Sequence, residues 1–382
     1  AAKEVAAAIS RPVESLTTAV AGTGSRLARA NRATDTMGAV VDALRAHDLE
    51  SAMARFSDRI VFDDHRRLSG DAIVDMRAAT ARVLQHYSNF EWGGVLAVRG
   101  GERLQMSWSR WSDDSGNETT HLHIQQIDVG DHIVYEGRFD EDDFEDAYRE
   151  LDRRYYAGGE GATYALNGLP ASEAPLLMAH SEFDRLVGEL SVPELRVESR
   201  SSRAFPPDRT GADLRDSLVE LNTFVASKKA WMSVVQWLSP TVTVSRLERE
   251  AVGADGERYT WTMLLATEHR DGRFVTMCEF DADDEEGAFA YAEDRVRGAS
   301  TRMAVTNTSC AHIPEIIAAL RARDIEGALA VFAEDFVYDD RRRSEVTRSQ
   351  GATGCARPSS ACSPSTPTSN SAYSRYVATD CT

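Results

Sequence analysis

Hydrophobic and polar positions in the first part of the chain change between a helical and a strand-like period. Apolar residues recur at helical spacing over about 32–47, and Leu49, Met53 and Phe56 continue this spacing in a shorter stretch. RIVFDD then alternates as a strand, and GDAIVDMRAATARVLQHY returns to the helical period. Four alternating stretches with Gly and Asp turns follow, and then the acidic-headed helix DEDDFEDAYRELDRRYY. Helices before an antiparallel meander predict an α+β fold with helices packed on one sheet face.

This pattern occurs more than once in the chain. Residues 44–67 return at 320–343 without a gap, and 13 of the 24 positions are identical. The offset of 276 residues is twice 138, which predicts a middle copy between them. Traces of that copy are the acidic endings around Phe139 and Phe280. The sequence therefore predicts three copies of one domain, two of them complete.

The repeats divide the chain into five parts. We expect a lead segment (1–24), a first copy (25–160), a diverged second copy (161–300), the truncated start of a third copy (301–346) and a tail (347–382). The tail holds eight Ser and six Thr but no Leu, Ile or Phe. Because it can bury too little apolar surface to offset its chain entropy, we expect it to be disordered.

Two interpretations of the tail remain open. One is a linker rich in Ser, Thr and Pro. The other follows from the codons. Read out of frame, codons for the tail permit residues in the order of the first copy, including Val-Leu-Ala-Val-Arg-Gly of 95–100. We therefore expect a frameshift, a single-base insertion or deletion near codons 344–350, which the gene sequence would test.

Composition narrows the classes of function. Lys and Arg number 43 against 61 Asp and Glu, which gives a net charge of −18 and an isoelectric point near 5.0. Nucleic-acid binding needs a clustered positive field, so we expect no nucleic-acid partner. The sequence has neither an apolar run of the roughly 20 residues that a membrane span requires nor a signal sequence. We expect no membrane contact and a cytoplasmic location, and the start without Met indicates a fragment.

Metal chemistry is not predicted. The five cysteines contain no CxxC pair, which excludes a zinc ribbon and a thioredoxin-type motif. His121 and His123 alternate along a strand and so share one face, but a zinc site needs a third ligand, and no third His or Cys presents itself. We expect no metal and no cofactor, and we interpret His123 as a hydrogen-bonding group of a pocket.

An Asp and His pair is the candidate for catalysis. Asp63 and His65 lie at the end of the first predicted strand, and a carboxylate can orient an imidazole for proton transfer near neutral pH. The alternative is an exposed strand end, where these side chains pair with Arg66 and Arg67. The third copy has Arg341 in place of His65, which favours this alternative.

Large aromatic side chains are the candidates for ligand binding. Trp108 shares a strand face with Leu104, and Tyr135 shares one with Phe139. Together with His123, these two aromatic residues are predicted to line a ligand cavity. The alternative is that they belong to the core, where large aromatics supply much of the buried area.

The order of elements resembles a known superfamily. A helical pair leading into ARF…IVFDDHRR, one more helix and a long meander are similar to the nuclear transport factor 2-like superfamily, most of all to its SnoaL-like polyketide-cyclase branch. FAEDFVYDD at 332–340 is typical of such domains. The resemblance covers the first copy well and the second weakly. It implies tandem cone-shaped α+β barrels, each with helices packed on a curved antiparallel sheet around an apolar pocket.

The resemblance implies two alternative functions, because the superfamily includes both enzymes and binding domains. One is a non-catalytic region, small-molecule-binding, accessory or sensory, of a larger bacterial ATPase, nucleotide cyclase or regulator protein. The other is an isomerase or cyclase that uses the acid–base pair in the pocket of the first copy. We expect a small apolar molecule as partner, and pairing of the copies within one chain or as a homodimer.

Overall fold

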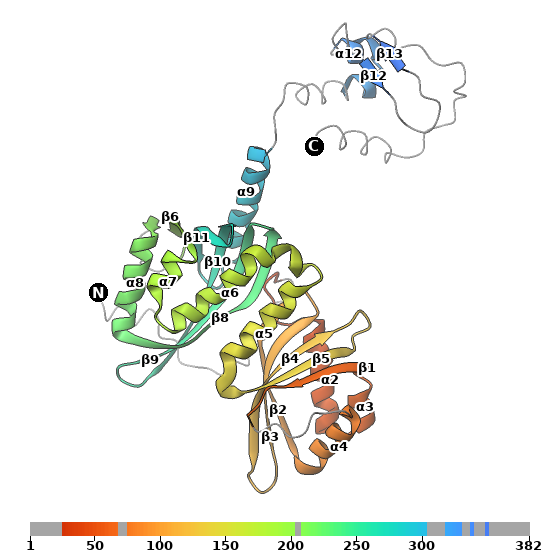
Figure 1. Cartoon of the computed structure of the whole chain (residues 1–382), viewed down its shortest axis with the longest axis vertical. Helices are drawn as coiled ribbons and strands as arrows, with labels where there is room; N and C mark the ends of the chain where they lie inside the picture. The colour runs from red at the N-terminus through yellow and green to blue at the C-terminus, as the bar shows by residue number, and fades with distance from the viewer. Residues whose placement is uncertain are drawn as a thin grey trace, which may run out of the picture. The chain divides into compact units, whose positions relative to one another are not determined.

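The protein is described from a computed structural model of the whole chain (Figure 1). Its residues fall into two compact units, Ala1–Ala299 and Ser300–Thr382. The structure describes residues 25–67, 75–202, 208–303, 318–330, 337–339 and 348–350. The predicted lead segment and all but three residues of the predicted tail lie outside the described residues. The predictions that the tail is disordered and frameshifted therefore also concern residues outside the described ones.

The first half of the larger unit spans residues 25–157. Polar side chains cap the starts of its first three helices. Asn31 accepts a hydrogen bond from the backbone N–H of Thr34 at the start of α2, and Asp48 and Asp75 cap α3 and α4 in the same way. Its elements in chain order are α2 (Arg32–Arg45), α3 (Leu49–Met53), β1 (Phe56–Asp64), α4 (Met76–His86), β2 (Asn89–Arg99), β3 (Leu104–Ser112), β4 (Glu118–Ile127), β5 (Ile133–Asp140) and α5 (Phe144–Ala157).

The second half, residues 161–299, has the same order of elements. One additional short strand, β7, follows its first strand. Its elements are α6 (Ala165–Ala179), α7 (Phe183–Gly188), β6 (Ser191–Ser199), β7 (Asp208–Thr210), α8 (Gly211–Phe224), β8 (Val225–Ser239), β9 (Val242–Gly253), β10 (Arg258–Arg270), β11 (Arg273–Phe280) and α9 (Glu285–Met303). Among the described residues, no helix combines the length and the apolar character needed to cross a membrane.

The eleven strands described in the larger unit form one sheet. Its order is β1-β5-β4-β3-β2-β8-β9-β10-β11-β6-β7, so that the second half repeats the strand order of the first in reverse. β1 pairs with β5 and β6 with β11 in parallel, and the halves meet where β2 and β8 pair in parallel, at Val98 and Val234. The predicted α+β class is confirmed. Tandem cone-shaped barrels stay a prediction, because the strands of both halves continue in one curved sheet (Figure 1).

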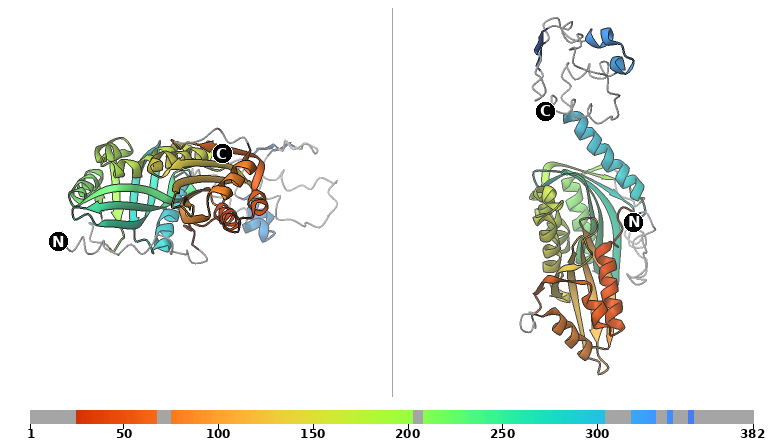
Figure 2. Two further views of the ribbon diagram at one scale, coloured as in Figure 1. Left: turned by 90° about the horizontal axis from the view of Figure 1, so that it is seen from below. Right: turned by 90° about the vertical axis from the view of Figure 1, so that its right-hand side faces the viewer.

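Helices cover both faces of this sheet (Figure 2). The face that carries the last helix of the first half carries the first helix of the second half. Tyr148 of α5 and Leu176 of α6 belong to one buried cluster on one face. Leu27, just before α2, and Phe289 of α9 belong to another cluster on the other face. The two halves are related by a half-turn about an axis parallel to the strands. Such a rotation reverses the strand order, keeps the strand direction and exchanges the two faces of the sheet, which explains this arrangement. The prediction that the helices lie on one face is therefore wrong, because α5 packs against the face opposite α2.

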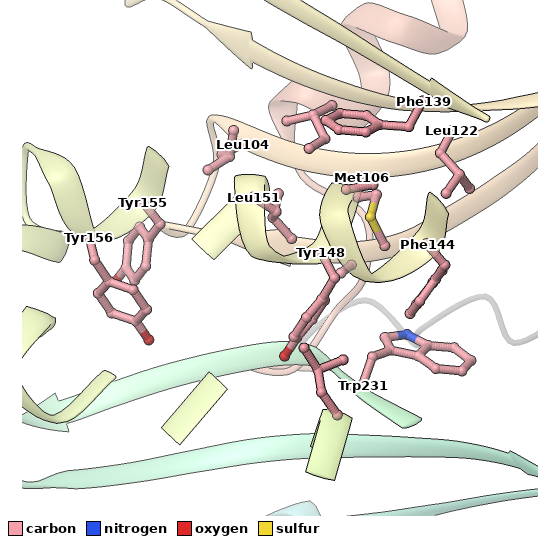
Figure 3. Packing of buried hydrophobic residues seen from close by; sticks show 14 of the residues in the cluster. Leu104, Met106, Leu122, Phe139, Phe144, Tyr148, Leu151, Tyr155, Tyr156 and Trp231 are labelled. Carbon is pink, nitrogen blue, oxygen red and sulfur yellow. The ribbon is translucent and has the colours of Figure 1, made fainter. Parts of the chain in front are cut away.

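Buried polar contacts join the two halves. Arg99 of β2 and Asp152 of α5 form a fully buried ion pair, with 2.5 Å between Nε and Oδ1. Arg99 also donates to the hydroxyl of Tyr148, which accepts the backbone N–H of Met232 in β8 at 3.2 Å. The indole N–H of Trp231 donates to a backbone carbonyl of β2 at 2.9 Å, and Figure 3 shows this ring beside α5. Since each of these groups is buried, loss of one partner would leave the other unpaired.

Helices α5 and α6 approach closely at Gly168. A Cβ atom at this position would overlap the ring of Tyr156. The hydroxyl of Tyr156 accepts the indole N–H of Trp237 at 3.3 Å, so the ring is tied to β8 of the second half. A glycine is therefore required where the two halves meet through their helices.

The smaller unit repeats a local feature of the first half. Its helix α12 (Ile325–Leu329) is capped by Asp324 in the way that Asp48 caps α3. Arg323 before this cap has a φ of +57°, and His47 has a φ of +52° at the equivalent position. A strand, β12 (Val337–Asp339), pairs with β13 (Arg348–Gln350), which lies in the predicted tail. The boundaries of the predicted third copy stay a prediction.

Candidate functional site

The first half contains a cavity of about 690 Å³ between α2, α4 and the sheet. Both helices and the strands contribute to its apolar wall, which comprises Met37, Val40, Leu44, Phe56, Met76, Val83 and Trp111. Apart from Tyr87 at the end of α4, the buried and half-buried charged or titratable groups in the wall come from the strands and the residues that follow them: Asp64, Arg66, His123, Glu136 and Arg138. The cavity thus combines an apolar body with a polar cluster on its sheet side.

Strand alternation decides which side chains reach the cavity. On β5, Glu136 and Arg138 face α2 and α4, whereas Tyr135 and Phe139 belong to the cluster under α5. At the end of β1, Asp64 lines the cavity. The face that the cavity uses is therefore the one that carries the even-numbered residues of β1 and β5.

Glu136 is the centre of the polar cluster. Its side chain is 2% exposed, and its Oε1 atom lies 2.8 Å from Nε of Arg138 and 3.2 Å from Nδ1 of His123. Burial raises the pKa of this carboxyl, but the charge of Arg138 and the hydrogen bond of His123 outweigh burial and hold the pKa at about 2. Glu136 is therefore ionised at neutral pH.

His123 is held as a neutral imidazole by its surroundings. Burial lowers its pKa, and this effect outweighs the hydrogen bond and the charge of Glu136, which raise the pKa. An ionised carboxylate only accepts hydrogen bonds, so Nδ1 of His123 carries the proton and donates to Glu136. The other ring nitrogen, Nε2, is then an acceptor, and it has no hydrogen-bond partner among the described residues.

A second ion pair lies in the wall beside this cluster. Arg66 forms two hydrogen bonds to Asp64, with Nε 2.8 Å from Oδ1 and a terminal nitrogen 2.6 Å from Oδ2. Burial raises the pKa of Asp64, but the hydrogen bonds and charge of Arg66 leave this pKa below its usual value. The charges of Asp64 and Arg66 therefore cancel within the wall.

His121 is the neighbour of His123 on the same strand face. The two ring centroids lie 4.7 Å apart, and the ring of Trp111 stands edge-on to His121 at 4.4 Å. Burial, and then the proximity of His123, hold the pKa of His121 well below its usual value. The prediction that both histidines share one face is confirmed. No group of three His, Cys, Asp or Glu that could hold a metal ion occurs among the described residues.

Two of the three predicted ligand-binding residues do not line this cavity. His123 lies in its wall, but Trp108 and Tyr135 point to the opposite face, where they pack with the cluster under α5. Trp108 covers Gly93, where a Cβ atom would overlap its ring, and the hydroxyl of Tyr135 donates to Glu150 at 3.2 Å. They do not line this cavity because strand alternation puts them on the face that α5 covers, and their role in ligand binding stays a prediction.

The predicted catalytic pair also lies outside the cavity. His65 and Asp63 are in contact, with 3.0 Å between Nε2 and Oδ2, but their side chains are 39% and 49% exposed. The ring of His65 stacks on Phe139 at 4.4 Å, which places it on the face of α5. Asp64 is the residue of this strand end that lines this cavity, whereas His65 lines a second cavity on the face of α5. A catalytic role of Asp63 and His65 stays a prediction. The alternative of an exposed strand end fits the structure better.

Sequence reasoning missed the four buried or half-buried charged residues of the cavity wall: Asp64, Arg66, Glu136 and Arg138. One signal was available. His123 had already been assigned to a pocket, and β5 pairs with β4 so that Arg138 lies opposite His123. Side chains directly opposite on neighbouring strands share a face, so the partner of His123 could have been sought on the strand that follows.

The second half has different residues at the equivalent positions. Leu122 pairs with Phe139 and Leu264 pairs with Phe280, which aligns His123 with Leu265. The same register aligns Glu136 with Met277. Leu265 is buried in an apolar cluster against which Met277 packs. The polar cluster of the cavity is therefore specific to the first half.

Similar solved structures cover about a third of the chain. No family model matches this chain, and neither does any curated protein. A proposed isomerase from Bacillus subtilis is 14% identical with a TM-score of 0.29, over 34% of this chain and 95% of that one.

Two further structures are similar over a comparable length. A proposed polyketide cyclase from Xanthomonas campestris is 11% identical with a TM-score of 0.27, over 32% of this chain and 95% of that one. An NTF-2 like protein of unknown function from Burkholderia xenovorans is 19% identical with a TM-score of 0.24, over 28% of this chain and 80% of that one. The similar structures are thus of the nuclear transport factor 2-like and polyketide-cyclase kinds.

Proposed function

We propose that the cavity of the first half binds a small, uncharged and largely apolar molecule that donates a hydrogen bond to His123. The observation that carries this proposal is the Nε2 atom of His123, which is buried in the cavity wall and has no partner among the described residues. A buried acceptor without a partner costs about 1–3 kcal/mol, so an O–H or N–H group placed there stabilises the complex.

The rest of the wall supports the same class of ligand. A volume of about 690 Å³ falls within the range of small-molecule sites. Asp64 and Glu136 are each paired with an arginine, so these four groups leave no net charge for an ionic ligand to neutralise. Apolar side chains of α2 and α4 cover the other side of the cavity.

On this proposal, the two halves are tandem SnoaL-like domains with different roles. The first half binds the small molecule, and the second half, with Leu265 and Met277 in place of the polar pair, supports it as a packed partner. Such a division of roles is that of an accessory or sensory region, as expected for part of a larger bacterial ATPase, nucleotide cyclase or regulator protein. The small molecule is then a signal or cargo and not a substrate.

A second candidate function is proton transfer, as in an isomerase or cyclase. The observation that favours it is the pair formed by His123 and Glu136 inside the cavity, which Asp63 and His65 do not provide. Nε2 of His123 would take a proton from an acidic C–H group, and Glu136 would stabilise the imidazolium that forms. The same proton would then return to a different atom of the molecule, which is the net change in an isomerisation.

Binding is tested by thermal shift of the full chain with uncharged aromatic alcohols, because a compound that binds the native state raises the melting temperature. We expect 2-naphthol to raise the melting temperature of the wild type and to lose this effect in His123→Leu. Leucine occupies the equivalent position of the second half, so this variant is compatible with the fold. The matched control is His65→Leu, since His65 lies on the other face.

Equal shifts of the wild type and His123→Leu with every alcohol of the series would contradict binding through His123. A second matched pair compares Trp111→Phe, which changes the cavity wall, with Trp108→Phe, which changes the opposite face. The second candidate is tested with 2-tetralone in deuterated water. If His123 transfers protons, the wild type incorporates deuterium next to the carbonyl faster than His123→Leu does, as measured by mass spectrometry.

A further inference from the structure

Arg138 is held between two aromatic rings in the cavity wall. The carbon of its guanidinium lies 4.8 Å from the ring centroid of Phe62 and 4.9 Å from that of Trp111. A planar guanidinium stacks well on aromatic faces, and its donors then point in fixed directions. The two rings therefore fix the direction in which Arg138 presents its N–H groups.

Arg138 and His123 bond to the same oxygen of Glu136. Nε and a terminal nitrogen of Arg138 each lie 2.8 Å from Oε1, whereas Nδ1 of His123 lies 3.2 Å from it. The side chains of His123 and Glu136 are 1% and 2% exposed, and that of Arg138 is 11% exposed. Short bonds from a charged donor are the stronger ones, so the charge of Glu136 is neutralised chiefly by Arg138.

The other groups around His123 do not take over this role. His121 on β4 is a neutral imidazole, and Asp64 near the end of β1 is already paired with Arg66. Helix α2 contributes apolar side chains, namely Met37, Val40 and Leu44. The titratable or charged groups that α4 and its ends contribute are Asp75, Arg82, His86 and Tyr87, the first three of which are exposed. Burial favours the neutral ring of His123 most strongly, and Glu136 and Arg138 are the charged pair that acts on its proton uptake next to burial.

We propose that Arg138 is a positioning residue that keeps His123 an uncharged hydrogen-bond acceptor, so that the cavity selects uncharged O–H or N–H donors over carboxylates. This inference rests on the proposed function for its ligand class, but its effect on His123 exists without any ligand. When Arg138 neutralises Glu136, the imidazole gains little from becoming a cation. Without Arg138, the buried carboxylate would instead stabilise an imidazolium, whose Nε2–H donates and no longer accepts.

The unliganded full chain gives the first test. Histidine ring signals are followed by NMR against pH and assigned with His123→Leu. We expect Arg138→Met to raise the titration midpoint of His123 by at least one pH unit, which corresponds to about tenfold in proton affinity. Arg138→Lys, which keeps a positive charge but loses the fixed fork, should give a smaller rise. The control is Arg149→Met on α5, at an arginine that is 44% exposed and pairs with Glu173.

An unchanged midpoint in Arg138→Met would overturn the proposal. If that variant fails to fold, Arg138→Lys decides, because an unchanged midpoint there overturns it equally. The double variant Glu136→Gln with Arg138→Met removes both charges together. We expect its His123 to titrate below that of Arg138→Met, since no carboxylate remains to stabilise the cation.

The second test compares 2-naphthol with 2-naphthoate, which have the same ring system and differ in charge at pH 7. We expect wild type to bind 2-naphthol at least tenfold more tightly, measured by quenching of tryptophan fluorescence, and Arg138→Met to reduce this ratio. Equal binding of both compounds by wild type would overturn the selectivity. Binding of neither compound, together with the NMR shift, would contradict the proposed function and the selectivity but support the effect of Arg138 on His123.

Discussion

The two halves of the larger unit share an order of elements but have different interiors. Between its helices and the sheet, the first half holds His123 and Glu136 beside a cavity of about 690 Å³. At the equivalent positions, the second half has Leu265, which is buried in an apolar cluster, and Met277, which packs against that cluster. The comparison shows that few side chains separate a cavity with polar chemistry from a packed interior on one backbone pattern.

The charged residues differ between the halves in a related way. Glu279 aligns with Arg138, because these residues pair with Leu265 and His123 on the neighbouring strands. Glu279 forms a buried ion pair with Arg209 of β7. Each half therefore has a charged residue at this point of its sheet, but the two residues have opposite signs. Arg138 has its partner on its own strand, whereas Glu279 has its partner on another strand. A buried charge persists only together with its partner, which restricts how the interiors can diverge.

The largest expected effect comes from placing the residue of the second half into the first. Glu136→Met leaves Arg138 without its carboxylate, and breaking a buried ion pair from one side costs about 3–5 kcal/mol. We expect a loss near the lower end, about 3 kcal/mol, because the side chain of Arg138 is 11% exposed. Urea unfolding measures this change. The double variant Glu136→Met with Arg138→Leu should regain most of the loss, and failure to regain it would contradict the pairing.

The reverse exchange tests the packing of the second half. Leu265→His places a polar ring in an apolar cluster. Met277 stands there in place of Glu136, and the carboxylate opposite Leu265, that of Glu279, is already paired with Arg209. We expect a loss of about 2 kcal/mol in the free energy of unfolding. Leu265→Met, which conserves volume, should cost less than about 1.5 kcal/mol. Equal losses in the two variants would show that polarity does not matter at this position.

The smallest effect is a difference in pH dependence. His121 and His123 in the first half, and His269 in the second, have pKa values that burial lowers, that of His269 to about 3. Below pH 6.5 the unfolded chain binds protons at these residues and the folded chain does not, so stability falls as pH falls. Each such histidine contributes at most about 1.4 kcal/mol per pH unit.

Between pH 6.5 and pH 5, the fall in stability per pH unit is expected to differ between the contributions of the two halves. Replacing both His121 and His123 by Leu should remove about twice as much of the slope as His269→Leu does, as measured by urea unfolding at several pH values. The carboxyl of Glu136 does not affect the slope in this pH range. Its pKa is about 2 in the folded state and has its ordinary value in the unfolded state, so the stabilisation that it contributes declines only at lower pH. Equal slopes in the two variants would contradict the assignment of two neutral histidines to the first half.

The elements of the first half were predictable because their hydrophobic periods are long and their caps are polar. The strand face that holds the cavity was not. On β1, Asp63 and Asp64 are the same residue type and point to opposite faces. On β3, the same is true of Trp108 and Trp111. Since α5 covers one face and α2 with α4 the other, apolar and polar residues occur on both, and alternation does not identify the cavity side. His123 lies in the cavity wall, and its role as a ligand-binding residue stays a prediction.

The joint between the halves could not be predicted for a different reason. β2 and β8 pair in register at Val98 and Val234, and Trp231 of β8 donates to a backbone carbonyl of β2. Helices α5 and α6 make further contacts there. No local pattern marks such a pairing, because both strands would have the same alternation as edges of separate sheets. The single sheet depends on contacts between residues that lie far apart in the sequence, such as Tyr148 with Met232.

The exchange of faces between the halves has a consequence for how their sequences can differ. Two halves related by a twofold rotation have the geometry of a homodimer, and here one chain supplies both halves. In a homodimer every substitution is present twice, so a change that removes the ligand chemistry removes it from both subunits. In one chain, each half has residues of its own. The second half can therefore carry Leu265 and Met277 where the first carries His123 and Glu136, while the pairing of β2 with β8 keeps both halves in one sheet.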